Sequence, residues 1–267
     1  MKGYEVIFCE ESTSLPLAVI SKKIFGSKII LWGGDSFYFG LSPFKQAIIR
    51  GIKKWVDGFL APSKYIARIA KEFFSCPIEI VYDPVLRIEQ FLSRKGDLTS
   101  KNICFVGTYS PRKGLERLVA AFQIVRKRYP KAKLYLIGEI PDRFSGPGIV
   151  LTGRVPAPEM YMEKCSIYVH PAIYEPFGLP VVEAILTGLV PVATKSTGAA
   201  EFLDRELIVD GSPESLSDKI IELFERGPAG LKRISLRLKK RILRKGFGLE
   251  KRCEEFRKKF WKLISTK

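Results

Sequence analysis

Two glutamates, Glu175 and Glu183, lie in one apolar stretch that reads HPAIYEPFGLPVVEAILTGLVPV over residues 170–192. Glu175 stands in a turn before a glycine and a proline that suit the start of a helix, whereas Glu183 stands inside the run VVEAI. Charged side chains are seldom buried without a partner, because moving a carboxylate out of water is costly. The helix dipole stabilises a carboxylate near a helix N-terminus a little, but this does not explain an acid in the middle of an apolar run. We therefore expect this stretch to serve a ligand as well as the fold.

A second stretch that could do chemistry, GTYSPRKG at residues 107–114, lies between a predicted strand and a predicted helix. It places Arg112 and Lys113 at the start of the helix, where unpaired backbone amides attract anions. Two cations beside those amides would strengthen a site for a phosphate or a diphosphate. A solvated turn with two surface cations is the alternative, and this stretch alone does not decide between the two. Its spacing matches neither the dinucleotide-binding nor the P-loop pattern, so neither mechanism is indicated.

The elements that would position these residues alternate between short apolar runs and amphipathic stretches. This rhythm predicts an α/β protein with parallel sheets that are covered on both faces. The apolar runs predict strands at residues 5–8, 28–32, 58–61, 78–81, 101–106, 133–137, 149–152, 167–170, 191–194 and 207–209. Helical spacing predicts helices at residues 16–25, 43–55, 63–74, 115–128, 158–164, 179–186 and 216–225. Ligands of such sheets bind at the carboxyl ends of the strands, which is the edge where both charged stretches would lie.

The composition of the 267 residues narrows the class of protein. An apolar fraction of 46% argues against disorder. No apolar run approaches the ~18 residues of a transmembrane helix, and the N-terminus does not resemble a secretory signal. Five scattered cysteines and a single histidine, His170, indicate a reducing cytoplasm and exclude a histidine-rich metal centre. The scarcity of glutamine and asparagine beside 73 charged residues suggests a heat-adapted source.

The net charge of +17 is concentrated near the C-terminus, where residues 231–267 hold 15 Lys or Arg and 3 Glu. Such a segment is typical of nucleic-acid binding, of contact with an anionic membrane surface or of a helix that is merely solvated. Nucleic acid is the least favoured partner, because the segment has no interleaved aromatic platform and no recognised motif. The run PFKQAIIRGIKKW at residues 43–55 is also basic and amphipathic, so it could lie on a membrane or turn its apolar side toward the core.

Three motifs in order along the chain resemble those of a known family. They are FVGTYSPRKGL at residues 105–115, VLTGRVP at residues 150–156 and HPxxxEPFGLPxxEA at residues 170–184. Together they are similar to the donor-binding signature of the family-4 glycosyltransferases, which are retaining enzymes with the two-domain GT-B fold. The resemblance implies two Rossmann-like parallel-sheet domains, of which the N-terminal one is incomplete. It also implies a donor substrate that is a nucleotide-diphosphate sugar, such as a UDP- or GDP-sugar, with no further cofactor and no metal.

The resemblance implies catalytic roles for three residues. Arg112 and Lys113 would hold the diphosphate of the donor, and Glu175 would help to fix the donor sugar. Cleavage of the sugar–phosphate bond puts charge on the departing diphosphate, so preorganised cations and amides would lower the barrier.

The remaining donor contacts that the resemblance implies come from side chains and backbone amides around the same edge. Glu183 would accept hydrogen bonds from the ribose hydroxyls, which explains a carboxylate inside an apolar helix. The other donor-binding residues would be Gly107, Thr108, Arg154, Val155, Phe177, Gly178 and Leu179. Of these, Arg154 and Val155 would lie against the base, and the amides of the last three would face the sugar and its phosphate.

The resemblance also predicts how the chain is divided. Residues 1–95 would form a partial N-terminal domain on the acceptor side, residues 96–248 the nucleotide-sugar-binding domain, and residues 249–267 a helix that crosses back to the N-terminal domain. We expect a cytoplasmic hexosyltransferase that acts on a saccharide or lipid-linked acceptor, with peripheral membrane contact through its basic helices. The alternative is a donor-binding subunit that needs a partner chain or a homo-oligomer. It is suggested by LWGGD at residues 31–35, where relatives carry a histidine, and by Thr108, where many carry an arginine.

Overall fold

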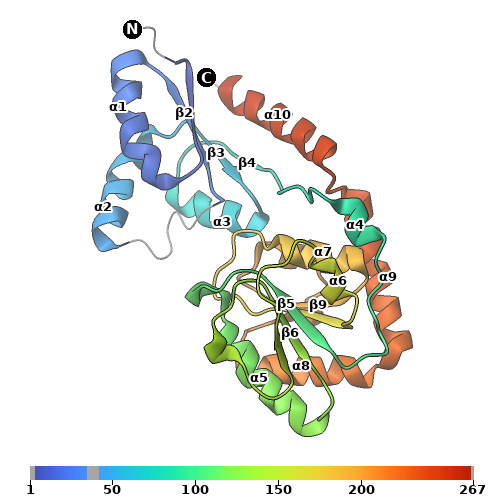
Figure 1. The fold of residues 1–267 in the computed structure, drawn as a ribbon. Helices are drawn as coiled ribbons and strands as arrows, with labels where there is room; N and C mark the ends of the chain where they lie inside the picture. The colour runs from blue at the N-terminus through green and yellow to red at the C-terminus, as the bar shows by residue number, and fades with distance from the viewer. Residues whose placement is uncertain (1–3, 35–41, 266–267) are drawn as a thin grey trace. The chain divides into compact units, whose positions relative to one another are not determined.

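The computed structural model describes residues 4–34 and 42–265 (Figure 1). The chain divides into two compact units. The first comprises the residues up to Pro84 together with those from Gly248 onward, and the second runs from Val85 to Phe247. Each unit is built on a parallel sheet with helices, which confirms the predicted α/β fold class.

The first unit has a four-stranded parallel sheet in the order β1-β2-β3-β4. Its strands are β1 (Val6–Cys9), β2 (Lys28–Trp32), β3 (Gly58–Ala61) and β4 (Ile78–Ile80), and the connections carry α1 (Leu15–Phe25), α2 (Pro43–Ile52) and α3 (Lys64–Phe73). Right-handed crossovers that always step in the same direction place these three helices on one face of the sheet. Ser42 and Ser63 mark the starts of α2 and α3, because each hydroxyl accepts a hydrogen bond from an amide of the first turn.

The last helix of the chain, α10 (Leu249–Ser265), packs against this N-terminal sheet. Its Leu263 is buried in a core with Ile30, Leu60 and Val81 from the sheet and its C-terminal edge. Because α10 takes part in this core, the segment after Gly248 belongs to the first unit although it lies at the far end of the sequence.

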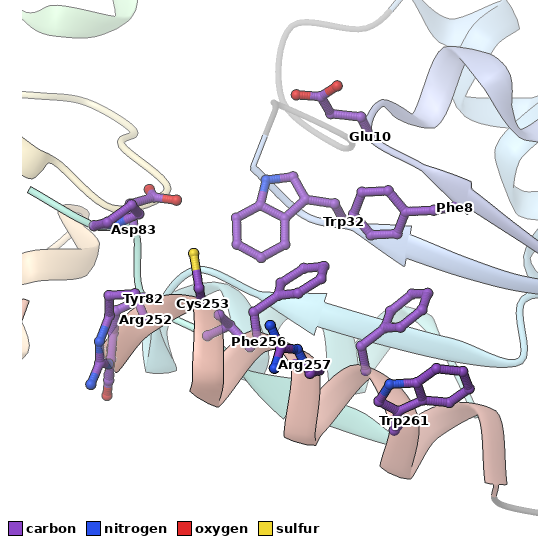
Figure 2. Close-up of a pocket in the computed structure, with 13 residues that line it drawn as sticks. Phe8, Glu10, Trp32, Tyr82, Asp83, Arg252, Cys253, Phe256, Arg257 and Trp261 are labelled. Atoms are coloured by element: carbon purple, nitrogen blue, oxygen red, sulfur yellow. The ribbon is translucent and has the colours of Figure 1, made fainter. Parts of the chain in front are cut away.

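A cavity of about 650 Å³ opens within the first unit between the sheet and α10. Phe8 and Trp32 line the cavity from the side of the sheet, and Phe256 and Trp261 line it from α10 (Figure 2). The walls are therefore largely aromatic, and none of the three sequence motifs contributes to them.

The second unit has a six-stranded parallel sheet in the order β10-β9-β8-β5-β6-β7. Its strands are β5 (Ile103–Val106), β6 (Leu134–Ile137), β7 (Ile149–Leu151), β8 (Ile167–His170), β9 (Val190–Thr194) and β10 (Ile208–Val209). From β5 the chain steps outward to β7, returns to place β8 on the other side of β5, and steps outward again to β10. The direction reverses between β5 and β8, which makes this the topological switch point of the sheet.

Helices cover both faces of the six-stranded sheet. On one face α5 (Leu115–Arg128) packs with α8 (Pro213–Glu225), and on the other α7 (Leu179–Thr187) packs with α4 (Ile88–Leu92), α6 (Glu159–Met162) and α9 (Gly227–Lys245). Every residue of β6, β8 and β9 is buried, which explains why these strands read as continuous apolar runs.

Two helices of the second unit, α4 and α9, are absent from the sequence prediction. The glycines and the proline near the start of α9 obscure its helical spacing, which is carried by four buried residues, Leu231, Ile234, Leu238 and Ile242. The short α4 lies in a segment that is polar in sequence, yet it packs against α7 and buries Phe91. Because α4 belongs with α7, the structural division falls after Pro84 and not after residue 95, and the second unit ends at Phe247.

The structure also bears on the predicted membrane contacts. No helix within residues 4–34 and 42–265 has both the length and the apolar character needed to cross a membrane. In the basic amphipathic run 43–55, Ile49 is buried while Ile48, Ile52 and Trp55 are half-buried, and α2 packs against α1. The apolar side of this run therefore turns mainly toward the protein.

Candidate functional site

The switch point between β5 and β8 brings the two charged stretches of the sequence together. These strands are hydrogen-bonded neighbours, so the loops that follow them leave the same edge of the sheet. The loop after β5 contains a 3-10 turn at Pro111–Lys113 and leads into α5, while the loop after β8 leads into α7. The backbone amide of Ile173 donates to the carbonyl oxygen of Arg112 at 2.8 Å, which ties the two loops together.

Glycine at position 114 allows this close approach. Gly114 has a φ of +67°, and a Cβ atom there would stand 2.2 Å from the carbonyl oxygen of Pro171. Both the left-handed backbone and the contact exclude a side chain. The turn that ends at Gly114 therefore holds Arg112 and Lys113 directly beside the loop after β8.

Glu175 lies at the centre of the resulting charged cluster, and only 7% of the residue is exposed. Its carboxylate forms an ion pair with Lys113, and its Oε1 lies 3.4 Å from a guanidinium nitrogen of Arg112. Its Oε2 lies 3.3 Å from Nε2 of His170. Arg112 also donates to the carbonyl oxygen of Tyr174 at 3.1 Å. The three residues expected to act in catalysis thus lie in direct contact.

Charge and hydrogen bonding fix the protonation of this cluster. Burial alone would raise the pKa of Glu175, but the hydrogen bond from His170 and the charges of Lys113 and Arg112 hold that pKa well below its usual range. Burial lowers the pKa of His170, and Glu175 offsets this only in part. At neutral pH the carboxylate is therefore ionised and the imidazole neutral, which leaves the cluster with one net positive charge.

The tautomer of His170 follows from its two neighbours. A carboxylate can only accept hydrogen bonds, so Nε2 carries the proton and donates it to Glu175. The other ring nitrogen, Nδ1, is then an acceptor, and the hydroxyl of Tyr168 donates to it at 2.7 Å. Tyr168 and His170 are both fully buried, so this chain of hydrogen bonds anchors the orientation of the Glu175 carboxylate.

The N-terminus of α7 lies next to the cluster. Gly178 precedes the helix with a φ of +89°, and a Cβ atom at this position would stand 3.2 Å from Cγ of Glu175 and 2.9 Å from Cγ2 of Thr197. The first amides of an α-helix have no intrahelical acceptor and carry a partial positive charge. The amides of Gly178 and Leu179 therefore add to the positive potential at this edge, and Phe177 is buried beside them.

A second group of expected residues lines a cavity of about 290 Å³ at the same edge of the sheet. Gly107 and Thr108 reach it from the loop after β5, and Arg154 and Val155 from the loop after β7. Arg154 is exposed, and one of its guanidinium nitrogens lies 3.9 Å from the carboxylate of Glu139. Because Gly107 and Thr108 belong to the loop that also carries Arg112 and Lys113, one elongated ligand can contact both the cavity and the charged cluster.

Glu183 lies apart from the charged cluster, in the middle of α7. It is partly exposed, and among the described residues its carboxylate has no hydrogen-bond or ion-pair partner. Burial raises the pKa of Glu183 to about 7, the positive charge of Arg87 opposes this shift, and the negative charge of Glu159 adds to it. Glu159 is itself buried, and within residues 4–34 and 42–265 its Oε2 has no hydrogen-bond partner. Arg87 donates to the carbonyl oxygen of Pro156 at 2.8 Å, in the loop that borders the 290 Å³ cavity.

Four residues of this region were not predicted to take part: Tyr168, His170, Glu159 and Arg87. A sequence signal exists for the first two, because His170 ends a predicted strand in the HP pair of the third motif and Tyr168 lies two positions earlier on the same side of the strand. Glu159 and Arg87 carry no such signal, since tertiary packing alone brings them near Glu183. In the two described ranges no group of three or more His, Cys, Asp or Glu side chains is arranged to hold a metal ion.

Comparison with known proteins identifies the class of fold and a family match within the second unit. The structure of sucrose-phosphate synthase from Thermosynechococcus elongatus superimposes with a TM-score of 0.80 at 17% identity, covering 98% of this chain and 74% of that one. Anabaena HepE, solved in complex with UDP and glucose, gives a TM-score of 0.74 at 17% identity, covering 97% of this chain and 78% of that one. The fold is that of the GT-B glycosyltransferases, as the motifs predict. Residues 100–226 match the family described as glycosyl transferases group 1.

A curated protein is also similar to this chain. An uncharacterized glycosyltransferase of Bacillus subtilis is 22% identical over 75% of this chain. The chain spans 61% of the length of that protein.

Proposed function

We propose that the protein is a retaining glycosyltransferase that transfers a hexose from a UDP- or GDP-sugar to a saccharide or lipid-linked acceptor. The observation that carries this proposal is the cluster of Arg112, Lys113 and Glu175 at the switch point, with its net positive charge and the adjacent N-terminus of α7. The match of residues 100–226 to the group 1 family and the UDP and glucose bound by the structural neighbour HepE support the donor class.

In this proposal the donor extends along the sheet edge. Its base occupies the 290 Å³ cavity between Gly107–Thr108 and Arg154–Val155, and its ribose hydroxyls donate to the unpaired carboxylate of Glu183. The diphosphate lies against Arg112 and Lys113. The sugar lies against Glu175 and the amides of Phe177, Gly178 and Leu179.

The charged cluster also supplies the chemistry. In the free protein Glu175 neutralises part of the charge of Lys113 and Arg112, and the more highly charged diphosphate takes over these cations when the donor binds. Glu175 is then free to accept hydrogen bonds from sugar hydroxyls, while neutral His170 keeps its carboxylate in place. When the sugar–phosphate bond breaks, the cations and the helix amides stabilise the departing diphosphate. The acceptor hydroxyl attacks from the side of the leaving group, and a phosphate oxygen takes its proton, so the configuration at the anomeric carbon is retained.

The proposal is tested by incubating the protein with UDP- and GDP-hexoses together with saccharide and lipid-linked acceptors. We expect release of the nucleotide diphosphate and a product whose anomeric configuration, read by NMR, equals that of the donor. Arg112→Ala should reduce turnover by about 100-fold or more, since loss of one preorganised donor to a developing negative charge typically has this effect. Arg128→Ala, which changes an exposed arginine at the C-terminal end of α5 that pairs with Glu225, is the matched control. An inverted product would contradict the retaining mechanism.

The residues that follow β2 favour a second candidate function, in which this chain binds the donor but does not turn it over alone. The family resemblance implies a histidine after this strand, whereas this chain has Gly33 and Gly34, and Asp35 lies outside the described residues. A Cβ atom on Gly33 would stand 2.4 Å from Cζ of Phe59, so a side chain at this position would require the buried Phe59 ring to shift. Nucleotide binding without release of nucleotide diphosphate from any donor would select this second candidate.

A further inference from the structure

The outward face of α9 combines exposed leucines with a high density of positive charge. The buried side of this 19-residue helix is formed by Leu231, Ile234, Leu238 and Ile242. On the opposite side Leu236 is 58% exposed and Leu243 is 49% exposed. Because they are seven positions apart, the two leucines lie one above the other on the same face of the helix.

Cations surround these leucines, and α9 contains no acidic residue at all. Arg237 and Arg241 form ion pairs with Asp204. Four further basic residues on the outward side, Lys232, Arg233, Lys240 and Arg244, are exposed and have no ion-pair partner in the described part of the chain. At helical spacing Lys232 lies on one flank of the two leucines, and Lys240 and Arg244 lie on the other.

A groove along one flank extends the positive surface. It has a volume of about 540 Å³ and is lined by Phe202 and by five cations of α9, namely Arg237, Lys240, Arg241, Arg244 and Lys245. A groove with this lining suits a phosphate-bearing headgroup, because several guanidinium and ammonium groups converge on it.

We propose that this face of α9 rests on an anionic membrane leaflet. Leu236 and Leu243 would enter the boundary between headgroups and acyl chains, and the surrounding cations would bind lipid phosphates. A merely solvated helix gains nothing from leucines at the centre of its charged face, and a nucleic-acid backbone offers them no apolar partner. The inference does not depend on the activity proposed for the site at the switch point.

The size of the expected effect follows from exposure and charge. About half of each leucine side chain remains to be buried, so insertion should strengthen binding about fivefold per leucine. One cation close to an anionic leaflet contributes about fivefold as well. Replacing two leucines, or two cations, should therefore weaken vesicle binding by about 25-fold.

The test is co-sedimentation of the full chain with phosphatidylcholine vesicles that contain about one third phosphatidylglycerol, and with pure phosphatidylcholine vesicles as the uncharged reference. We expect binding to the anionic vesicles only. It should be weakened about 25-fold by Leu236→Ser with Leu243→Ser, and about 25-fold by Lys240→Ala with Arg244→Ala. The matched controls are Leu17→Ser with Leu86→Ser, at leucines that are 74% and 72% exposed, and Lys127→Ala with Lys131→Ala, at exposed lysines on and just after α5. Both control pairs should bind like the wild type, and equal melting temperatures should show that all variants are folded.

Three outcomes would overturn the proposal. The first is absence of binding to the anionic vesicles. The second is that the double leucine variant binds like the wild type while the double cation variant binds more weakly, which would mean a purely electrostatic surface. If the protein then also binds a DNA duplex with an affinity that falls steeply with salt, nucleic acid would be the partner. The third is an equal loss of binding in the control variants.

Discussion

The substitution Glu183→Gln should stabilise the free protein at alkaline pH and leave it unchanged at acidic pH. Burial raises the pKa of Glu183 from 4.5 to about 7, so the folded state holds the proton more tightly than the unfolded state does. Stability is therefore lost as the pH rises from 4.5 through 7, where the folded state must accommodate an ionised carboxylate without a partner. At 1.36 kcal/mol for each pKa unit, this loss amounts to about 3 kcal/mol above pH 7.

Glutamine resembles the protonated carboxyl group in shape and does not titrate, so the variant avoids this loss. We expect its free energy of unfolding to match that of the wild type near pH 5 and to exceed it by up to about 3 kcal/mol at pH 8. For the second unit, that corresponds to a melting temperature raised by roughly 6–12 °C at pH 8. Urea unfolding of both proteins at the two pH values measures the difference, with Glu214→Gln, at an exposed glutamate on α8, as control. A gain of equal size at both pH values, or a loss at pH 8, would refute the account of Glu183.

The remaining predictions concern the cluster at the switch point and the backbone that supports it. Glu175→Gln should destabilise the protein by about 3 kcal/mol at pH 7, because Lys113 and Arg112 lose a buried partner. The pKa of Glu175 is depressed in the folded state, so its stabilising effect is present above pH 4.5 and is lost as the pH falls. The difference in free energy of unfolding between variant and wild type, measured by urea unfolding, should therefore shrink in acid. A difference that stays constant with pH would count against the ion pairs. Gly114→Ala should cost more than Gly153→Ala, because both positions have left-handed backbone but only the first meets another atom, the carbonyl oxygen of Pro171 at 2.2 Å. The second should cost about 1 kcal/mol from backbone strain alone, and equal costs in thermal unfolding would mean that the two loops do not need their close approach.

The sequence predicts most of the fold because the strands of the second unit are buried on both faces. A short, mostly apolar run such as residues 167–170 is typical of a strand buried on both faces, and it coincides with β8. The two helices that the sequence does not predict, α4 and α9, have residues that argue against a helix beside those that favour one. In α9 a proline and two glycines precede a regular stripe of buried residues, and in α4 only the packing of Phe91 distinguishes a helix from a polar linker.

The charged cluster could be anticipated for a similar reason. The carboxyl ends of parallel strands meet at one edge, so Arg112, Lys113 and Glu175 had to lie near one another once β5 and β8 were neighbours. The surroundings of Glu183 could not be anticipated. Glu159 and Arg87 come from a short helix and from a segment that is polar in sequence, and only tertiary packing brings them close to α7.

The most direct test of the central claim is calorimetric titration of the protein with UDP, GDP and ADP, for the wild type, Lys113→Ala and Lys127→Ala. The account predicts saturable binding of one of these nucleotides, weakened at least tenfold in Lys113→Ala and unchanged in Lys127→Ala, whose lysine is exposed on α5 away from the cluster. Thermal unfolding of the wild type at a hundredfold excess of that nucleotide over its Kd should show a gain of about 2.7 kcal/mol. Absence of binding by all three nucleotides, or equal binding by Lys113→Ala and the wild type, would contradict the assignment of the switch-point cluster as the site of the donor diphosphate.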